Sequence, residues 1–526
     1  MIKNWLSLNF NHISFLMKLL LLGLLFFSSL ANSQETIFQT SVDSKNLNNV
    51  KKISEDLNST YKKTYYFNQN NFDLKQNLNI ILPNNKKIVA IYQKSITYPV
   101  GSYSSIYKIK DDSNAELVFS EYDNVITGMY VSSENSKYVF QQTSTNSFAV
   151  SEVNEKSFKN KEQLIDYEIN ADDFYKKSTL INNDVCAEGT PICTGKTTID
   201  IMVVYTLSAS ILWGGDATSK STITTSITNM NVALINSGIS NITFNLVYTD
   251  IVNYVETDNF QTDLVSLRSS TDGILDEIHT IRADYGADLV GLVLGSPTSS
   301  CGRGNLNTSP TNYSNRSSFV VNLYSCVLSN FSLAHEFGHN MGLNHDWFVN
   351  QETLPCSHHH GYINRSAIIN GTSSTASQRW RTIMSYSDEC AAKGIGCSRI
   401  NRWANPNVTY NSESTGIAIG QTDPSDEAFG FRRFACIVSD FMPTVLTNNE
   451  FNQKIFSVYP NPSKNTITIN SNFEIDDIAV FNTIGQLVLN SKQSRINIEM
   501  LQKGVYFVKI LTADGNTVGV KKIFKE

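Results

Sequence analysis

The sequence predicts a mixed α/β domain in the middle of the chain, with a mostly β segment before it and a small β-sandwich after it. Strand and helix patterns alternate across the middle of the chain, which is typical of an α/β sheet. Short runs of alternating polar and apolar residues dominate the first part, for example 87–95 and 137–150. The last part contains short strand patterns separated by glycine turns. A chain of 526 residues can form several domains, each with its own core.

The middle region begins near Thr198, where the first buried-strand pattern starts. We expect strands at 199–205, 241–248, 287–294 and 318–324, and helices at 222–235 and 271–282. The apolar residues of the first helix recur at helical spacing and share one face: Ile223, Ile227, Met230 and Leu234. The last strand leads directly into a helix that carries a histidine motif.

Residues 1–33 have the features of a signal peptide. Lys18 is followed by an almost unbroken apolar run to Phe27, and small residues precede Gln34. This run is too short to span a bilayer as a stable helix, and no later stretch approaches the ~20 apolar residues required. We therefore expect an exported chain without an integral membrane segment, translated from either Met1 or Met17.

The charge of the chain argues against one class of partner. The formal net charge is −6, which indicates no broad basic surface for a phosphate backbone. We expect no nucleic acid partner, and we expect the chain to be a monomer.

Three histidines, one glutamate and one glycine stand at fixed spacing within 334–346. His335 and His339 are four residues apart, so a helix places both imidazoles on one face toward a single zinc ion. Glu336 is angled toward the open coordination position, where it can act as a general base. Gly342 allows a left-handed turn that brings back His345 as the third ligand. The chain has only eight histidines, which makes a chance match on an ordinary helix a poor explanation.

With Asp346 after the third histidine, this pattern resembles the metzincin metallopeptidases, and among them the reprolysin (adamalysin) branch. The resemblance covers about 196–443, and we expect the catalytic domain at 196–445. It implies a twisted mixed sheet with an active-site helix and one zinc ion per catalytic domain. It also implies that Asp346 anchors the loop of His345 through a buried hydrogen bond.

The segment 381–386 resembles the Met-turn of the same family. Met384 would form an apolar floor beneath the zinc ligands, although a lone methionine is equally compatible with ordinary core packing. Tyr386 resembles the tyrosine that astacins and serralysins place near the zinc, and both an oxyanion-stabilising and a structural role remain open.

Residues 34–195 precede the catalytic domain and follow the signal peptide. This position favours a pro-segment that covers the active site until it is removed, which would make the chain a zymogen. An unrelated binding domain is the alternative.

The eight cysteines lie in the middle of the chain, and an even number in an exported protein predicts disulfides. The alternative, a cysteine zinc site, lacks C-x-x-C spacing. Cys186 and Cys193 lie just before the catalytic domain, so a local disulfide between them is preferred over a thiolate latch on the zinc.

Three further features have ordinary interpretations. The run His358, His359 and His360 could bind a metal, but consecutive side chains diverge, which favours a surface loop. An acidic group could hold calcium, but its spacing matches no EF-hand loop, which favours a solvated turn; its members are Asp423, Asp426 and Glu427. His279 lies in an amphipathic helix and is expected to be structural.

A polar linker is expected at 446–454, followed by the small β-sandwich at 455–526, with strands at 466–470, 477–482, 505–511 and 518–524. The motifs at 459–462, 485–486 and 503–506 resemble the C-terminal sorting domain of the type IX secretion system. The resemblance implies an interaction with that machinery and a secreted or cell-surface product, exported through the periplasm and across the outer membrane.

These features together predict a secreted zinc-dependent endopeptidase that acts on extracellular proteins or peptides. The first alternative is a binding protein or adhesin that uses the peptidase fold as a scaffold, against which the intact Glu336 argues. The second is a zinc hydrolase that acts on a non-peptide amide, which the motif alone does not exclude.

Overall fold

The computed structural model describes residues 40–42, 59–66, 73–144, 147–154, 166–169, 186, 193, 195–296, 300–309, 315–443, 456–471, 475–482, 486–511 and 517–526. The expected signal peptide and the linker at 446–454 lie outside these residues. The chain forms two compact units, Met1–Pro443 and Thr444–Glu526. The first unit contains both the N-terminal β segment and the α/β domain.

The N-terminal β segment forms a nine-stranded antiparallel sheet in the order β1-β2-β9-β8-β7-β6-β5-β4-β3. Its strands are β1 (Thr40–Val42), β2 (Ser59–Tyr66), β3 (Leu78–Ile81), β4 (Lys87–Thr97), β5 (Tyr103–Ile109), β6 (Asp112–Tyr122), β7 (Val125–Val131), β8 (Lys137–Ser144) and β9 (Ser147–Val153). Alternation along the strands puts apolar side chains such as Leu117, Phe119 and Phe140 into one core. The mostly β prediction therefore agrees with the described residues.

The α/β domain contains a six-stranded sheet in the order β10-β14-β15-β13-β11-β12. Its strands are β10 (Tyr167–Ile169), β11 (Thr197–Thr206), β12 (Ile242–Val252), β13 (Leu289–Leu294), β14 (Gly302–Leu306) and β15 (Phe319–Leu323). Among the described strands of this sheet, β14 and β15 form the one antiparallel pair, and the other neighbours are parallel. The sheet is therefore mixed, and all four strands expected in this region are present. The short strands β10 and β14 were not expected, because three to five residues give little periodic signal.

Nine α-helices accompany this sheet in the described part of the first unit. They are α4 (Leu207–Trp213), α5 (Asp216–Asn236), α6 (Phe260–Arg268), α7 (Asp276–Tyr285), α8 (Tyr324–Val327), α9 (Ser332–Asn340), α10 (Arg365–Asn370), α11 (Asp388–Ala392) and α12 (Glu427–Val438). Two small two-stranded sheets, β16 (Trp380–Arg381) with β17 (Ser398–Arg399) and β18 (Asn405–Tyr410) with β19 (Glu413–Thr415), complete the domain.

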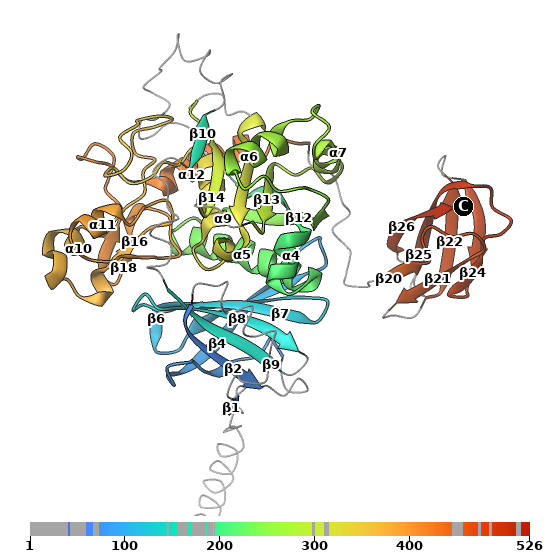
Figure 1. The fold of residues 1–526 in the computed structure, drawn as a ribbon, viewed down its shortest axis with the longest axis horizontal. Coiled ribbons are helices and arrows are strands. Elements are labelled where there is room, and N and C mark those ends of the chain that lie inside the picture. The colour runs from blue at the N-terminus through green and yellow to red at the C-terminus, as the bar shows by residue number, and fades with distance from the viewer. Residues whose placement is uncertain are drawn as a thin grey trace, which may run out of the picture. The chain divides into compact units, whose positions relative to one another are not determined.

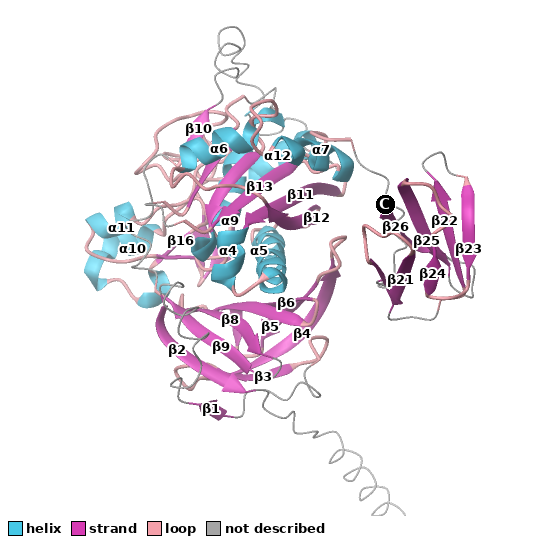
Figure 2. Cartoon of the chain, turned by 45° about the vertical axis from the view of Figure 1, so that its right-hand side comes forward, coloured by secondary structure: helices cyan, strands magenta, loops and turns pink. Residues whose placement is uncertain are grey.

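Helix α5 lies between the two large sheets, as Figures 1 and 2 show from two sides. Its apolar residues, including Ile223 and Ile227, enter the core of the α/β domain. Its hydroxyl side chains face the N-terminal sheet, where Thr225 and Ser221 lie 2.9 and 2.7 Å from the Thr127 hydroxyl. Thr225 also donates to the Ser221 carbonyl one turn earlier, so its hydroxyl has hydrogen-bond partners in the helix and in the sheet. The N-terminal sheet therefore packs on the α/β domain through hydroxyl pairs, and also through apolar contacts such as the cluster of Ile106, Val118 and Val232.

All eight cysteines form disulfides, but the preferred local Cys186–Cys193 pair was wrong. The pairs are Cys186–Cys356, Cys193–Cys436, Cys301–Cys326 and Cys390–Cys397. The first two join the start of the domain to residues 170 and 243 positions later. A thiolate latch on the metal is thereby excluded, since no cysteine is free.

The second unit consists of two sheets around one apolar core. One sheet contains β20 (Phe456–Tyr459), β21 (Thr466–Ser471) and β24 (Arg495–Asn497); the other contains β22 (Asp477–Asn482), β23 (Leu487–Ser491), β25 (Gly504–Leu511) and β26 (Thr517–Lys525). Within the described parts of both units, no helix is long and apolar enough to cross a membrane.

Helix α12 begins with a buried carboxyl group that should make stability depend on pH. Burial raises the pKa of Glu427 to about 8, whereas an unfolded glutamate titrates near ~4.3. The folded chain therefore keeps a proton that the unfolded chain loses, so stability falls as pH rises from about 4 to about 8, by up to ~1.4 kcal/mol per pH unit.

Glu427→Gln keeps an oxygen for the Ala404 N–H, which now donates to Glu427 at 2.6 Å. Urea unfolding between pH 5 and pH 8 should show a flatter profile for this variant, while Glu134→Gln at an exposed site keeps the wild-type slope; equal slopes for all three proteins would contradict the assignment.

Candidate metal and active site

Helix α9 and the turn after it bring the three predicted ligands together. His335 and His339 lie one turn apart on the helix. Gly342 adopts the left-handed conformation expected of it, with φ of 79°. The chain then reverses, and His345 Nε2 lies 3.2 Å from His335 Nε2 and 3.1 Å from His339 Nε2.

Backbone carbonyl groups orient two of these imidazoles. His335 Nδ1 donates to the Ile383 carbonyl and His339 Nδ1 donates to the Leu343 carbonyl, each at 2.8 Å. The Nε2 lone pairs therefore point inward at one another. Burial also lowers the pKa of His335 to about 3, which keeps that imidazole in the neutral form that a metal ligand requires.

The donor set suits zinc. Three imidazole nitrogens around one zinc ion at ~2.0–2.1 Å are separated by roughly 3.3 Å in a tetrahedral site, close to the observed spacings. Inward-facing lone pairs repel one another unless a cation lies between them. The chemistry of these three residues therefore fits a zinc ion.

A fourth donor comes from Asp166, which the sequence analysis did not single out. Its carboxylate oxygens lie 3.2 Å from His335 Nε2, 3.1 Å from His339 Nε2 and 2.9 Å from His345 Nε2. Asp166 precedes β10, which pairs in parallel with β14 at the edge of the sheet. Its own carbonyl accepts from the Gly304 N–H at 3.0 Å. A residue of the N-terminal segment thus occupies the position that three protein ligands leave open.

Glu336 lies beside this cluster in a nearly closed space. It is 1% exposed, and burial, followed by the negative charge of Asp166, raises its pKa well above the usual range. The glycines of β14 make room for its carboxylate, because a Cβ at Gly302 would overlap Oε1 and a Cβ at Gly304 would lie 3.3 Å from Oε2. The Gly-Arg-Gly sequence of β14 was a signal for this close approach that the sequence analysis did not use.

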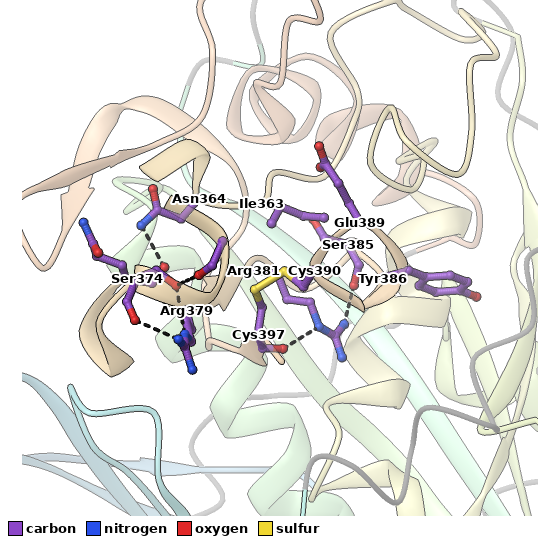
Figure 3. Close-up of a disulfide and its surroundings, with 12 residues drawn as sticks. Ile363, Asn364, Ser374, Arg379, Arg381, Ser385, Tyr386, Glu389, Cys390 and Cys397 are labelled. Atoms are coloured by element: carbon purple, nitrogen blue, oxygen red, sulfur yellow. Dashed lines mark hydrogen bonds between the residues drawn. A yellow bond between two sulfur atoms is a disulfide. The ribbon is translucent and has the colours of Figure 1, made fainter. Parts of the chain in front are cut away.

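The expected Met-turn lies directly beneath α9. Met384 is fully buried, and a Cβ at Gly338 of the helix would overlap its sulfur. Arg381 supports the turn from below, because it donates to the carbonyls of Cys397 and Ser385 (Figure 3). The small disulfide loop Cys390–Cys397 therefore helps to hold the turn under the histidines.

Tyr386 and Asp346 connect the turn to the ligands. The Tyr386 ring stacks on His345 with centroids 4.2 Å apart, and its hydroxyl donates to Asp166. Asp346 is buried and accepts from the Tyr386 N–H at 2.8 Å and from the Phe348 N–H at 3.2 Å. The hydrogen bonds of Asp346 therefore join the segment after His345 to the Met-turn.

The interpretation of the histidine run as a surface loop was wrong, because all three side chains are buried. His359 Nδ1 donates to the Gly342 carbonyl at 2.8 Å, and His360 Nδ1 donates to the His345 carbonyl at 2.6 Å. His358 packs edge to face on Phe429. The run supports the ligand turn from behind, a role that depends on contacts distant in sequence.

The solvated acidic turn was also wrong for two of its three residues. Asp426 and Glu427 are buried: Asp426 caps α12 by accepting from the Phe429 N–H at 2.9 Å, and Glu427 accepts from Ala404. Neither of the two possible metal-binding groups among the described residues contains Asp423, Asp426 or Glu427. His279 is half-buried against the Ser269 carbonyl at 2.8 Å, in agreement with a structural role.

The packing of Met384 on α9 gives a test of the site. Gly338→Ala should lower the free energy of unfolding by about 1–3 kcal/mol, since the added methyl group overlaps the Met384 sulfur. It should also weaken zinc binding, because the turn below His335 must shift. The control is Gly396→Ala, where a Cβ meets nothing within 4 Å. Thermal unfolding and zinc titration measure both effects; wild-type values for Gly338→Ala would show that this contact does not shape the site.

Known protein families match two parts of the chain. The family described as Metallo-peptidase family M12 matches residues 195–403, and the secretion system C-terminal sorting domain matches residues 457–526. A peptidyl-Asp metalloendopeptidase of Stenotrophomonas maltophilia (strain R551-3) is 34% identical over 247 residues, which are 46% of this chain and 53% of that protein. A protein of the same name from Xanthomonas campestris pv. campestris is 33% identical over 229 residues, which are 44% of this chain and 48% of that protein. The chain thus spans about half the length of the curated relatives it matches.

Among solved structures, metalloproteinase-II from Bacteroides fragilis is 10% identical, with a TM-score of 0.33 over 56% of this chain and 84% of that protein. The sorting-domain match indicates export through the type IX secretion system to the cell surface or the extracellular space. Residues 195–403, with their mixed α/β fold and their histidine motif, therefore match a reprolysin-like M12 metallopeptidase domain, and a type IX sorting domain follows at 457–526.

Proposed function

We propose that this chain is a secreted zinc-dependent endopeptidase that hydrolyses internal peptide bonds of extracellular proteins. The observation that carries this proposal is the convergence of three buried Nε2 atoms within 3.2 Å of their neighbours, with Glu336 beside them. The M12 match at 195–403 supports it. The relatives are named peptidyl-Asp metalloendopeptidases, which makes acidic side chains part of the proposed substrate class.

His335, His339 and His345 would hold the zinc ion, one per catalytic domain. When bound, zinc supplies a Lewis acid that lowers the pKa of a water molecule to about 7 and polarises the peptide carbonyl. Glu336 accepts the proton of the attacking water and passes it to the leaving amine. The Tyr386 hydroxyl, which now donates to Asp166, can donate to the developing oxyanion once that carboxylate is gone.

The substrate would pair with the edge of β14 that β10 now covers. This edge carries β10 in the described structure, so its backbone groups already bind an extended segment. An incoming peptide must therefore replace β10 before hydrolysis begins.

We infer that residues 34–195 are a pro-segment that keeps the enzyme latent. Its β10 strand covers β14, and its Asp166 carboxylate stands within 3.2 Å of all three imidazoles. Burial first, and then the negative charge of this carboxylate, raise the pKa of Glu336 and favour its protonated form. Removal of Asp166 would therefore open a coordination position and also take away the second of these two causes.

Each of two alternative functions predicts a different set of hydrolysed substrates. A scaffold protein without catalysis would bind zinc yet leave every protein and peptide intact. A hydrolase of non-peptide amides would leave casein and gelatin intact but hydrolyse small amides. The buried, fully formed surroundings of Glu336 favour peptide hydrolysis over the scaffold.

Glu336→Gln tests the catalytic assignment in the processed protein. Casein hydrolysis should fall on the order of 10²- to 10⁴-fold, because the amide cannot accept the water proton. Zinc content, measured by elemental analysis, should stay at one ion per chain, and a chelator should abolish wild-type activity until zinc returns. Glu277→Gln at an exposed site of α7 serves as the control. Full activity of Glu336→Gln would remove this residue from the mechanism.

Asp166→Ala tests latency in the unprocessed chain. Hydrolysis of a short fluorogenic peptide should rise by about tenfold or more, since one charge-assisted contact to the metal cluster is lost and β10 is held less firmly. Mass spectrometry must show that the chain stays uncut. The control is Asp111→Ala, which removes an exposed carboxylate of the N-terminal sheet. An Asp166→Ala chain that folds, binds zinc and stays as inactive as wild type would place the latency elsewhere.

A further inference from the structure

A cationic pocket of about 480 Å³ lies beside the substrate edge of the α/β domain. Its lining includes three arginines and one histidine: Arg268, Arg282, Arg316 and His279. Within the lining residues there is no aspartate or glutamate. Such a pocket attracts a carboxylate.

Arg282 is a fixed charge at the wall of this pocket. Its side chain is buried, and its guanidinium donates to the carbonyls of Ala287 and Asp288 at 2.9 and 2.7 Å. It also donates to the Ser318 hydroxyl at 2.8 Å. These bonds hold the Arg282 guanidinium in place. Because it already donates to protein oxygens, a more accessible arginine would bind a ligand.

Arg268 at the end of α6 is that residue, because it already binds an acidic side chain on the substrate edge. Its Nη1 lies 3.5 Å from Oε2 of Glu168, and the two side chains are 22% and 23% exposed. Glu168 belongs to β10 and lies opposite Asn305 of β14. It follows Asp166 by two residues, so both side chains project from the same face of the strand, roughly 6.6 Å apart.

The pro-segment strand therefore shows where an acidic side chain of a bound peptide would lie. β14 runs from Gly302, beside Glu336, toward Leu306. A substrate that pairs antiparallel, the slightly more stable arrangement, would reach Asn305 before it reaches Glu336. The residue opposite Asn305 would then precede the cleaved bond by about two positions.

We propose that Arg268 is a specificity-determining residue that binds a glutamate or aspartate about two positions before the cleaved bond of a peptide substrate. This inference rests on the proposed endopeptidase function. In the latent chain Glu168 occupies the same subsite, and its departure with the pro-segment frees Arg268 for the substrate. Arg268 is a binding residue and touches no reacting atom.

The test uses the processed protein and pairs of fluorogenic peptides that differ only in Glu or Gln at this position. Wild type should hydrolyse the Glu peptide with a kcat/KM about tenfold higher, the value of one partly exposed charge-assisted bond. Arg268→Gln should reduce this ratio to about one, because kcat/KM for the Glu peptide falls. Arg268→Glu should prefer a Lys peptide, which a general loss of folding would not produce.

Lys393→Gln removes an exposed positive charge of the same domain and should keep the tenfold ratio. Hydrolysis without a Glu preference, or a preference that Arg268→Gln leaves unchanged or that Lys393→Gln also removes, would overturn this inference while the endopeptidase function stands. Absence of hydrolysis of every peptide by processed wild type with one bound zinc would instead overturn the proposed function, and this inference with it.

Discussion

The active-site region depends on two hydrogen bonds that aim imidazole rings at one point. The carbonyls of Ile383 and Leu343 accept from Nδ1 of His335 and His339, so the opposite nitrogens face inward. The alignment requires two turns, because the Met-turn supplies the Ile383 carbonyl and the turn after Gly342 supplies the Leu343 carbonyl. Both of these residues are buried. The supports beneath and behind the helix are therefore as necessary to the cluster as the ligands themselves.

The N-terminal sheet and the short strand β10 perform different tasks. The sheet packs on α5 through hydroxyl groups and also through apolar side chains, because Ile106 and Val118 cluster with Val232 of the helix. β10 instead occupies the substrate edge and delivers Asp166 to the histidines. Cys186 and Cys193 lie inside the proposed pro-segment 34–195 and form disulfides with Cys356 and Cys436 of the catalytic domain, so a cut at residue 195 would leave the segment attached. Release of the N-terminal sheet and of β10 therefore requires a cut that precedes Cys186.

The interpretations that proved wrong share one cause. The histidine run and the acidic turn were predicted to be exposed because the residues next to them in the sequence are polar. In the fold, His359 and His360 reach the ligand turn, and Glu427 accepts from the N–H of Ala404, the residue before β18. The same holds for Cys186, whose partner lies 170 positions away and not seven. Local composition carries no information about which distant segment covers a residue.

The sequence by itself determined the elements whose cause is local. Helical spacing places His335 and His339 on one face, and the glycine that allows a left-handed turn returns His345. Apolar periodicity likewise predicted the four longer strands of the α/β sheet and the helices expected at 222–235 and 271–282, but not β10, β14 or the shorter helices. Only the tertiary structure decided that Asp166 meets the histidines, that Arg268 meets Glu168, and which cysteines pair. These contacts join residues far apart in the chain, and their distances are set by the packing of sheets and helices, which no short pattern encodes.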